Sequence, residues 1–256
     1  MATVAAMDDR VSGICARYLE IADRWAPGAV EGLYLHGSVA LGDYRHGVSD
    51  VDFVAVTGQA LDPDIARAIH AELRRGGRRP FFDGIYLGWR DLRVDPGRAA
   101  AGISVHEWSV DPASRAERGL VTWHVLAQGG VAVRGPAVAE LGIHTDWLAL
   151  AESTRRNLVE YWAPWLTRTG RGPVGLSAWA TSWGVLGVAR LRHTLAAGRV
   201  TSKTEAAAFA TATYGPRWHR IIREALRIRV GGAARYRNPW RRRADLVGFV
   251  EQALRR

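Results

Sequence analysis

Cysteine and lysine are nearly absent from this chain of 256 residues, which holds one of each, Cys15 and Lys203. A single cysteine excludes an internal disulfide and fits a reducing compartment. No stretch approaches the roughly 20 apolar residues that a membrane-spanning helix needs. The residues before Arg10 contain no apolar run of signal-peptide length. We therefore expect a soluble, cytoplasmic protein with no membrane partner.

The scarcity of lysine contrasts with 34 arginines. Such a bias is typical of the nucleotide composition of a source genome rather than of a binding function. Lysine is nevertheless a compact point charge that can follow a phosphate through a reaction, which the planar guanidinium does less well. Lys203 is therefore a candidate phosphate ligand, with survival by chance as the alternative.

Charge is distributed unevenly along the chain, whose formal net charge is +10. Residues 151–256 hold 19 Arg, one Lys and six acids, a net of +14, whereas residues 1–150 hold 15 Arg and 19 acids, a net of −4. This change of sign and the wholly helical pattern after residue 144 predict two domains, 1–145 and 146–256. The basic half either attracts an anionic partner or is a solvated arginine-rich surface.

The order of strands and helices predicts an α/β layer in the first domain, followed by an all-α helical bundle. In the first domain the spacing indicates helices at 10–25, 62–75 and 113–128, and strands at 32–36, 51–56, 80–87 and 131–133. In the second domain the candidate helices are 147–166, 176–197, 203–213, 217–229 and 243–255.

The most informative motif is Leu35-His36-Gly37-Ser38, followed after a loop by Asp50-Val51-Asp52. Side chains at i and i+2 of a strand share a face, so the two carboxylates are costly unless a cation lies between them. Hard oxygen ligands suit magnesium, which completes its shell with water and substrate phosphates. The Gly37-Ser38 turn can present backbone N–H groups and a hydroxyl to a phosphate. The motif therefore predicts a metal-dependent site for a nucleoside triphosphate.

Asp83 supplies a third carboxylate. It lies between Phe82 and Gly84 on a hydrophobic strand, where an unpaired carboxylate is expensive. We interpret it as a metal ligand and catalytic base, with a salt-bridged strand residue as the alternative. For Asp50 and Asp52 the alternative is a pair that caps a turn.

These residues resemble the nucleotidyltransferase signature of the DNA polymerase β superfamily. The longer run Leu33–Ala40 with Val48–Phe53 most resembles the streptomycin/spectinomycin adenylyltransferases, and three further segments agree. The resemblance spans roughly residues 10–232 and implies an α+β fold, in which a polymerase β-like mixed-sheet domain precedes the helical one, with Mg²⁺ and ATP at the site. The three agreeing segments are His106-Glu107-Trp108, Val131–Pro136 and Val188–Lys203.

The resemblance also implies roles in the first domain. Gly37, Ser38 and Ser49 would contact the triphosphate, and Asp50 and Asp52 would hold magnesium. Asp83 takes the place of the family's base, which is usually Glu, so its carboxylate is one methylene shorter.

In the second domain, Arg190 and Lys203 match residues that reach across the domain cleft to the phosphates, and Arg229 replaces a tyrosine that contacts them. Ser202-Lys203-Thr204-Glu205 is a capping box, with Ser202 as the N-cap. A lysine in the first helical turn opposes the helix dipole. This placement is a hint that a phosphate binds there.

The acceptor side departs from the family. Glu107 and Trp108 match a place where family members bind aminoglycosides, but the acids that precede the Arg190 helix are missing. Residues 176–183 carry no charge. Loss of charge-assisted contacts argues against streptomycin and favours a less charged or partly aromatic acceptor. The alternative for Trp179 and Trp183, four apart on a helix, is burial in the bundle core.

The function predicted is Mg²⁺-dependent transfer of AMP from ATP to a hydroxyl of an aminoglycoside-like small molecule, releasing pyrophosphate, as in antibiotic resistance. We expect a monomer. One alternative keeps the chemistry and uses a protein or RNA acceptor bound by the basic domain. Another is a binding protein without catalysis, against which the intact acid triad argues.

Overall fold

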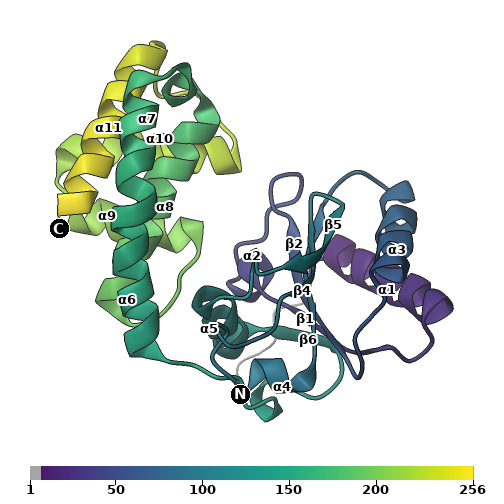
Figure 1. The fold of residues 1–256 in the computed structure, drawn as a ribbon. Helices are drawn as coiled ribbons and strands as arrows, with labels where there is room; N and C mark the ends of the chain where they lie inside the picture. Colours follow the sequence, from purple (N-terminus) through teal and green to yellow (C-terminus); the bar gives the residue numbers. More distant parts are fainter. Residues whose placement is uncertain (1–6, 256) are drawn as a thin grey trace. The chain divides into compact units, whose positions relative to one another are not determined.

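The computed structural model describes residues 7–255. The chain divides into two compact units, of which the first ends at Thr145 and the second begins at Asp146 (Figure 1). None of the helices in the described part combines the length and apolar content needed to cross a bilayer.

A six-stranded mixed sheet forms the centre of the first unit, in the order β5-β4-β3-β2-β1-β6. β2 and β3 are parallel, and the other neighbouring pairs are antiparallel. The predicted α+β class is confirmed. The strands are β1 (Val30–Leu35), β2 (Val51–Thr57), β3 (Phe82–Leu87), β4 (Gly102–His106), β5 (Ser109–Ser114) and β6 (Val131–Arg134).

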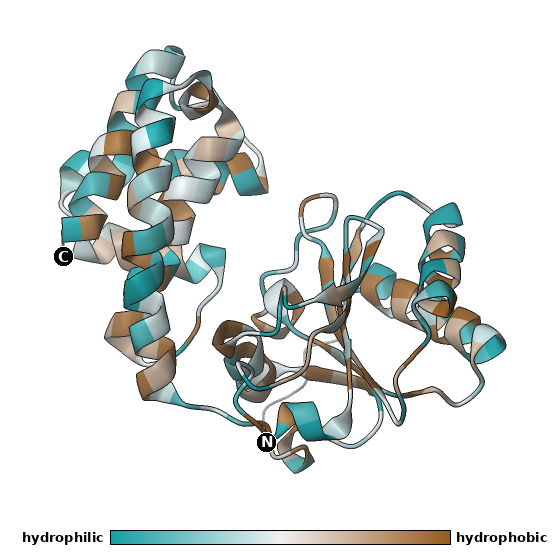
Figure 2. Cartoon of the chain, in the orientation of Figure 1, coloured by the Kyte–Doolittle hydropathy of each residue, from teal (hydrophilic) through white to brown (hydrophobic). Residues whose placement is uncertain are grey.

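Helices cover both faces of this sheet. The helices α1 (Asp9–Trp25) and α3 (Pro63–Arg75) lie on the face that contains Phe53, and α4 (Trp89–Leu92) and α5 (Leu120–Gly129) lie on the face that contains Val54. This alternation follows from the pleat, because successive side chains of a strand point to opposite faces. Figure 2 shows the hydrophobic residues concentrated along the strands.

The helix predicted at 113–128 is wrong in its first half. Residues Ser109–Ser114 form β5, an edge strand paired with β4, and α5 begins only at Leu120. Gly119, whose backbone is extended, is the N-cap of α5. Pro112 is tolerated in β5 because an edge strand leaves some backbone N–H groups unpaired. Pairing with β4, a strand that the sequence pattern did not reveal, takes only Ala113 and Ser114 from the predicted helix, and residues 115–119 connect β5 to α5.

The second unit is a helical bundle, as predicted, with α8 at its centre. An added Cβ at Gly184 or Gly187 would lie 2.5 Å or 2.4 Å from the rings of Trp165 and Trp162, so these glycines let the indoles pack against α8. A π-helical segment, Leu158–Trp162, interrupts the predicted helix 147–166. The helices are α6 (Trp147–Asn157), α7 (Ala163–Arg171), α8 (Ala178–Ala197), α9 (Lys203–Thr213), α10 (His219–Val230) and α11 (Pro239–Arg255).

Candidate active site

Three strand ends meet at one end of the sheet in the first unit. β1 runs antiparallel to β2, so the end of β1 lies beside the start of β2, and the parallel β3 starts next to it. The His36 N–H donates to the Asp52 carbonyl oxygen at 3.0 Å, and Asp52 stands opposite Asp83 in the strand register. The topology thus brings the Gly37 turn and the two carboxylates together.

Asp52 lies in a strongly acidic environment. Burial raises the pKa of its carboxyl to about 7, with further contributions from the charges of Glu117, Asp50 and Asp83, against a lowering by the hydrogen bond from the Ser38 N–H. Glu117, which precedes α5, was not anticipated from the sequence. A divalent cation would relieve this repulsion and hold the Asp52 carboxylate ionised.

Asp83 is buried beside the β4–β5 turn. The Glu107 N–H donates to its Oδ1 at 2.9 Å, and His106 Nδ1 lies 3.1 Å from its Oδ2. Burial raises the pKa of Asp83 to about 6; the Asp50 charge adds to this increase, whereas the Glu107 N–H and His106 oppose it. A carboxylate with a pKa close to neutrality is suited to accepting a proton from a hydroxyl.

The turn that contacts Asp83 has a strained backbone. Glu107 has φ 48° and Trp108 has φ 69°, and together they link the paired residues His106 and Ser109. A two-residue hairpin of this kind usually contains Asn-Gly, and positive φ is unfavourable for a bulky side chain. The Trp108 Nε1 donates to the Arg78 carbonyl oxygen at 3.2 Å. Glu107 therefore reaches the site through its backbone, and Trp108 anchors the segment before β3.

Asp50 lies just before β2 and is paired with a cation. The Arg79 Nη1 is 3.1 Å from the Asp50 Oδ1, and the Arg79 guanidinium stacks 4.0 Å from the centroid of the Phe81 ring. Within residues 7–255, no three His, Cys, Asp or Glu side chains are grouped so as to hold a metal ion by themselves. The metal set of Asp50, Asp52 and Asp83 stays a prediction, and magnesium needs only one or two protein carboxylates beside substrate phosphates.

Gly37 allows the Asp52 carboxylate to approach the turn. Its φ is +57°, and an added Cβ would lie 1.9 Å from the Asp52 Oδ2. The short helix α2 (Gly37–Ala40) starts at this point. Both the left-handed backbone and the close approach require glycine.

Replacing Gly37 by alanine should reduce kcat by at least about 10²-fold, because the Cβ must displace the Asp52 carboxylate and a shift near 1 Å has that cost. The matched control is Gly42→Ala, since Gly42 has φ +63° and nothing within 4 Å of an added Cβ. Steady-state kinetics would compare the two variants. Equal losses in both would show that backbone strain, and not the contact with Asp52, is responsible.

The two serines of the predicted phosphate site differ in environment. Among the described residues, the Ser38 hydroxyl is buried without a hydrogen-bond partner. The Ser49 hydroxyl accepts from the Arg45 N–H at 3.0 Å and closes the loop before β2. Ser38 is thus the better placed of the two to donate to a substrate oxygen.

Comparisons with known proteins bear on both units. A model of the nucleotidyltransferase domain matches residues 16–74, and a model of the aminoglycoside adenylyltransferase C-terminal domain matches residues 174–256. These matches confirm the predicted resemblance to the aminoglycoside adenylyltransferases. Spectinomycin adenyltransferase AAD(9) from Enterococcus faecialis, crystallised with ATP and spectinomycin, shares the fold at a TM-score of 0.73 and 12% identity, over 96% of this chain and 99% of that chain. Curated protein sequences give no match.

In this adenylyltransferase, the predicted phosphate ligands of the second unit lie at the junction of α8 and α9. The Arg190 Nε donates to the Thr201 carbonyl oxygen at 3.0 Å. Lys203 is the first residue of α9, and its N-cap Ser202 accepts from the Glu205 N–H at 3.1 Å, which confirms the predicted helix start. Arg229 is buried in the last turn of α10. Contact of these residues with phosphate stays a prediction.

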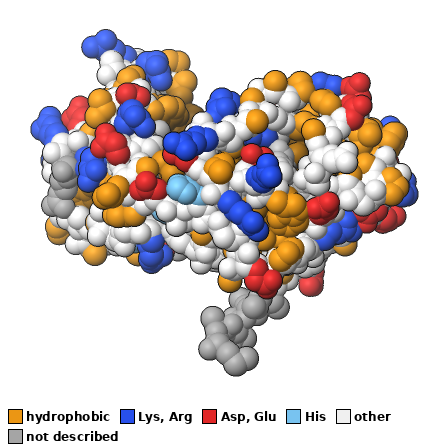
Figure 3. All heavy atoms as spheres, turned by 60° about the horizontal axis from the view of Figure 1, so that its bottom comes forward, with side chains coloured by type: hydrophobic (Ala, Val, Ile, Leu, Met, Phe, Trp, Pro, Cys, Tyr) orange, Lys and Arg blue, Asp and Glu red, His pale blue; other side chains and the backbone are white. Residues whose placement is uncertain are grey.

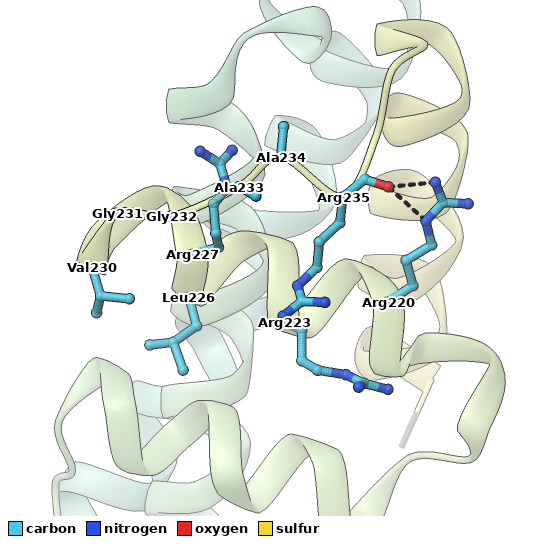
Figure 4. Close-up of a pocket in the computed structure, with 10 residues that line it drawn as sticks. All are labelled: Arg220, Arg223, Leu226, Arg227, Val230, Gly231, Gly232, Ala233, Ala234 and Arg235. Atoms are coloured by element: carbon cyan, nitrogen blue, oxygen red, sulfur yellow. Dashed lines mark hydrogen bonds between the residues drawn. The ribbon is translucent and has the colours of Figure 1, made fainter.

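A cavity of about 640 Å³ in the second unit contains none of the predicted site residues. Four arginines and no acid line it, and Figure 4 shows them around the segment that follows α10: Arg220, Arg223, Arg227 and Arg235. On the face shown in Figure 3, Lys and Arg side chains are spread among hydrophobic and acidic residues.

Proposed function

We propose that this adenylyltransferase transfers AMP from ATP to a hydroxyl group of an aminoglycoside-type small molecule and releases pyrophosphate. The observation that carries the proposal is the pairing of Asp52 with Asp83 on adjacent strands beside the Gly37 turn. The ATP and spectinomycin in the AAD(9) crystal support the choice of both substrates.

Asp83 is the proposed base. Its carboxylate accepts the proton of the acceptor hydroxyl as the hydroxyl oxygen bonds to the α-phosphorus of ATP. The bond from the α-phosphorus to the bridging oxygen breaks, and pyrophosphate leaves with that oxygen. The pKa of about 6 keeps Asp83 ionised at neutral pH and able to take the proton.

Asp50 and Asp52 are the proposed ligands of Mg²⁺, with Asp83 next to them. The donor set fits this ion, because it consists of hard carboxylate oxygens, and their mutual repulsion adds to the burial that raises the pKa of Asp52. When bound, Mg²⁺ supplies charge neutralisation to the phosphates. The strand register holds Asp52 and Asp83 side by side before any ligand arrives.

The triphosphate is proposed to contact Gly37, Ser38 and Ser49, together with Arg190, Lys203 and Arg229. The strongest support is the buried Ser38 hydroxyl, because a polar group without a partner is rare unless a ligand or water completes it. For the acceptor, Glu107 and Trp108 remain the proposed contacts in the first unit.

Replacing Lys203 by arginine should lower kcat about tenfold or more, because the larger, planar guanidinium group cannot take the position of a compact ammonium group at a reacting phosphate. Arg217→Lys, an exchange at an exposed position of the same unit, serves as the control. Steady-state turnover is the measurement. Near-normal turnover of Lys203→Arg would mean that the single lysine of the sequence is retained by chance and has no specific role at the phosphates.

The proposed function is tested by measuring pyrophosphate release with ATP and Mg²⁺ over a panel of aminoglycosides, spectinomycin, other metabolites and RNA. Mass spectrometry should then find the acceptor increased by one AMP. Absence of any adduct with a small molecule would contradict the proposal.

A protein or RNA acceptor is the second candidate, favoured by the arginine-lined cavity of the second unit. Binding of RNA through such a surface should weaken steeply with salt. An AMP adduct on RNA or protein, formed when no small molecule reacts, would select this alternative.

A further inference from the structure

The cavity of about 640 Å³ beside α10 gathers positive charge that the predicted active site does not use. We call it the arginine cavity, after Arg220, Arg223, Arg227 and Arg235. Among the described residues, only Glu224 forms an ion pair with any of them, and its Oε1 lies 2.6 Å from the Arg227 Nη2. The other three guanidinium groups repel one another, which is unfavourable unless an anion or salt screens them.

Glu224 holds two parts of this cavity in place. Its buried carboxylate accepts from the Arg227 Nε at 3.2 Å and Nη2 at 2.6 Å, and from the Arg235 backbone N–H at 3.0 Å. The Arg242 Nη1 lies 3.9 Å from the same carboxylate. The charge of Glu224 is therefore compensated within the protein and does not neutralise the remaining arginines.

Backbone carbonyl groups orient the exposed arginines. The Arg220 Nε donates to the Arg235 carbonyl oxygen at 3.0 Å, its Nη2 donates to the same oxygen, and its guanidinium stacks 4.1 Å from the centroid of the Tyr236 ring. The Arg223 Nε donates to the His219 carbonyl oxygen at 3.2 Å. Both Nη groups of Arg223 and the Nη1 of Arg220 remain available to a ligand. Groups that are held in advance lose less entropy on binding.

The arginine cavity lies on a different side of α10 from Arg229, the predicted phosphate ligand. An α-helix turns about 100° per residue, so positions 220, 223 and 227 fall within about 60° of one another, and position 229 lies about 120–180° from them. Arg229 is buried, whereas Arg220 and Arg223 are exposed. The cavity is therefore separate from the phosphate contact predicted on this helix.

The rest of the lining is small or apolar. Leu226 and Val230 lie on the side of the cavity away from Arg220, and residues 231–234 form the adjoining wall (Figure 4). None of the 10 lining residues is aromatic, so the bases of an RNA strand would find no ring on which to stack. The volume lies within the range of roughly 300–1,000 Å³ that is typical of small-molecule sites. These features favour a small ligand over RNA.

We propose that the arginine cavity binds a small anion with two or more linked phosphates, at a site separate from the one that holds ATP for transfer. Guanidinium groups match phosphate oxygens in geometry and charge, and three uncompensated ones suit linked phosphates better than a single phosphate. An inorganic polyphosphate and a nucleoside polyphosphate share this chemistry. The proposal goes beyond the proposed function, since no step of AMP transfer requires the cavity.

The test titrates inorganic triphosphate into the full chain by isothermal titration calorimetry, in EDTA so that Mg²⁺ cannot support binding at Asp52. Arg223→Gln and Arg235→Gln should each weaken binding about tenfold, the loss expected for one charge-assisted hydrogen bond. Arg168→Gln and Arg171→Gln are matched controls, because both arginines are exposed at the end of α7 and lie outside the cavity. They should bind like the wild type, and melting temperatures without ligand verify that every variant is folded.

A variant of the predicted nucleotide site separates the two locations. Lys203 does not line the cavity, so Lys203→Ala should leave the binding that depends on Arg223 unchanged. Wild-type affinity in both Arg223→Gln and Arg235→Gln, or equal losses in the α7 controls, would overturn the proposal. Binding of an RNA oligonucleotide without binding of triphosphate would also overturn it and select the RNA alternative.

A nucleoside triphosphate titrated into Lys203→Ala in EDTA distinguishes the two sources of phosphate. Binding tighter than that of inorganic triphosphate, and reduced to the inorganic level by an added Val230→Ser exchange, would show that the nucleoside contacts the apolar side of the cavity. Equal binding of both anions would show that the phosphates alone are recognised. Both results support the site and differ only in the source of the ligand.

The outcomes also distinguish this proposal from the proposed function, which is decided by AMP adducts. Without added triphosphate, the double variant Arg223→Gln/Arg235→Gln should form adducts at the wild-type rate. Loss of that rate would place the cavity within the active site and overturn the proposal of a separate site. If the wild type forms no adduct, the proposed function fails, and triphosphate binding still decides the role of the cavity.

Discussion

Replacing Asp52 by asparagine is expected to stabilise the protein while abolishing its activity. In the folded chain the pKa of Asp52 is about 7, above its ordinary value of 3.8, chiefly through burial. Between these pH values the folded state binds more protons than the unfolded state, so stability falls as pH rises from about 4 to about 7. Asparagine carries no charge and removes this destabilisation.

The effect of Asp52→Asn on stability therefore depends on pH. A shift of about 3 pKa units corresponds to roughly 4 kcal/mol, and relaxation of the surroundings with water penetration reduces that to about 1–2 kcal/mol. At pH 8 the melting temperature should rise by a few degrees, whereas near pH 4 it should not change. Asp64→Asn, at a surface carboxylate of α3, is the control.

Activity and ligand binding of Asp52→Asn should change in the opposite direction. Calorimetric titration with ATP and Mg²⁺ should show loss of the metal-dependent component of binding, because the variant lacks the central carboxylate of the site. Unchanged metal-dependent binding would contradict the assignment of the site. An unchanged or lower melting temperature at pH 8 would contradict the electrostatic account of Asp52.

Asp83→Asn should lower kcat by about 10³-fold, within the range that general base catalysis supplies, and should leave the KM for ATP nearly unchanged. Asparagine keeps the shape of the side chain and can still accept from the Glu107 N–H, so what is lost is proton acceptance and the charge interaction with His106. Asp83→Glu should retain more activity, because it keeps the carboxylate and adds one methylene. Steady-state kinetics with saturating ATP measures both.

The pH profile provides an independent check on Asp83. The base is active when it is ionised, so the kcat of the wild type should rise as pH increases through about 6 and level off above it. The residual activity of Asp83→Asn should lack this rise. Asp111→Asn, on the exposed strand β5, should keep the wild-type profile. If kcat depends on pH in the same way in Asp83→Asn and the wild type, another group accepts the proton of the acceptor hydroxyl.

The parts of the site that lie in one local segment could be predicted from the sequence. The Gly37-Ser38 turn and the strand that carries Asp52 follow from residue type and strand alternation. The start of α9 at Lys203 follows from the capping serine. These features depend on residues within about one helical turn, where propensity and capping dominate.

The contacts made across the sheet could not be predicted in this way. His106 and the Glu107 N–H reach Asp83 because β4 and β5 form a hairpin, and the sequence pattern predicted neither of these strands. Glu117 reaches the surroundings of Asp52 through the return from β5 to α5. Arg79 compensates the charge of Asp50 across 29 residues of chain.

The sequence by itself determined the chemistry available to this protein: carboxylates on adjacent strands, a glycine turn beside them, and one lysine at a helix start. Only the tertiary structure decided the environments of these groups. Burial and neighbouring acids set the pKa values of Asp52 and Asp83. Spacing placed Trp179 and Trp183 on one side of α8, but which side of a helix is covered depends on the elements packed against it, and these leave both indoles exposed.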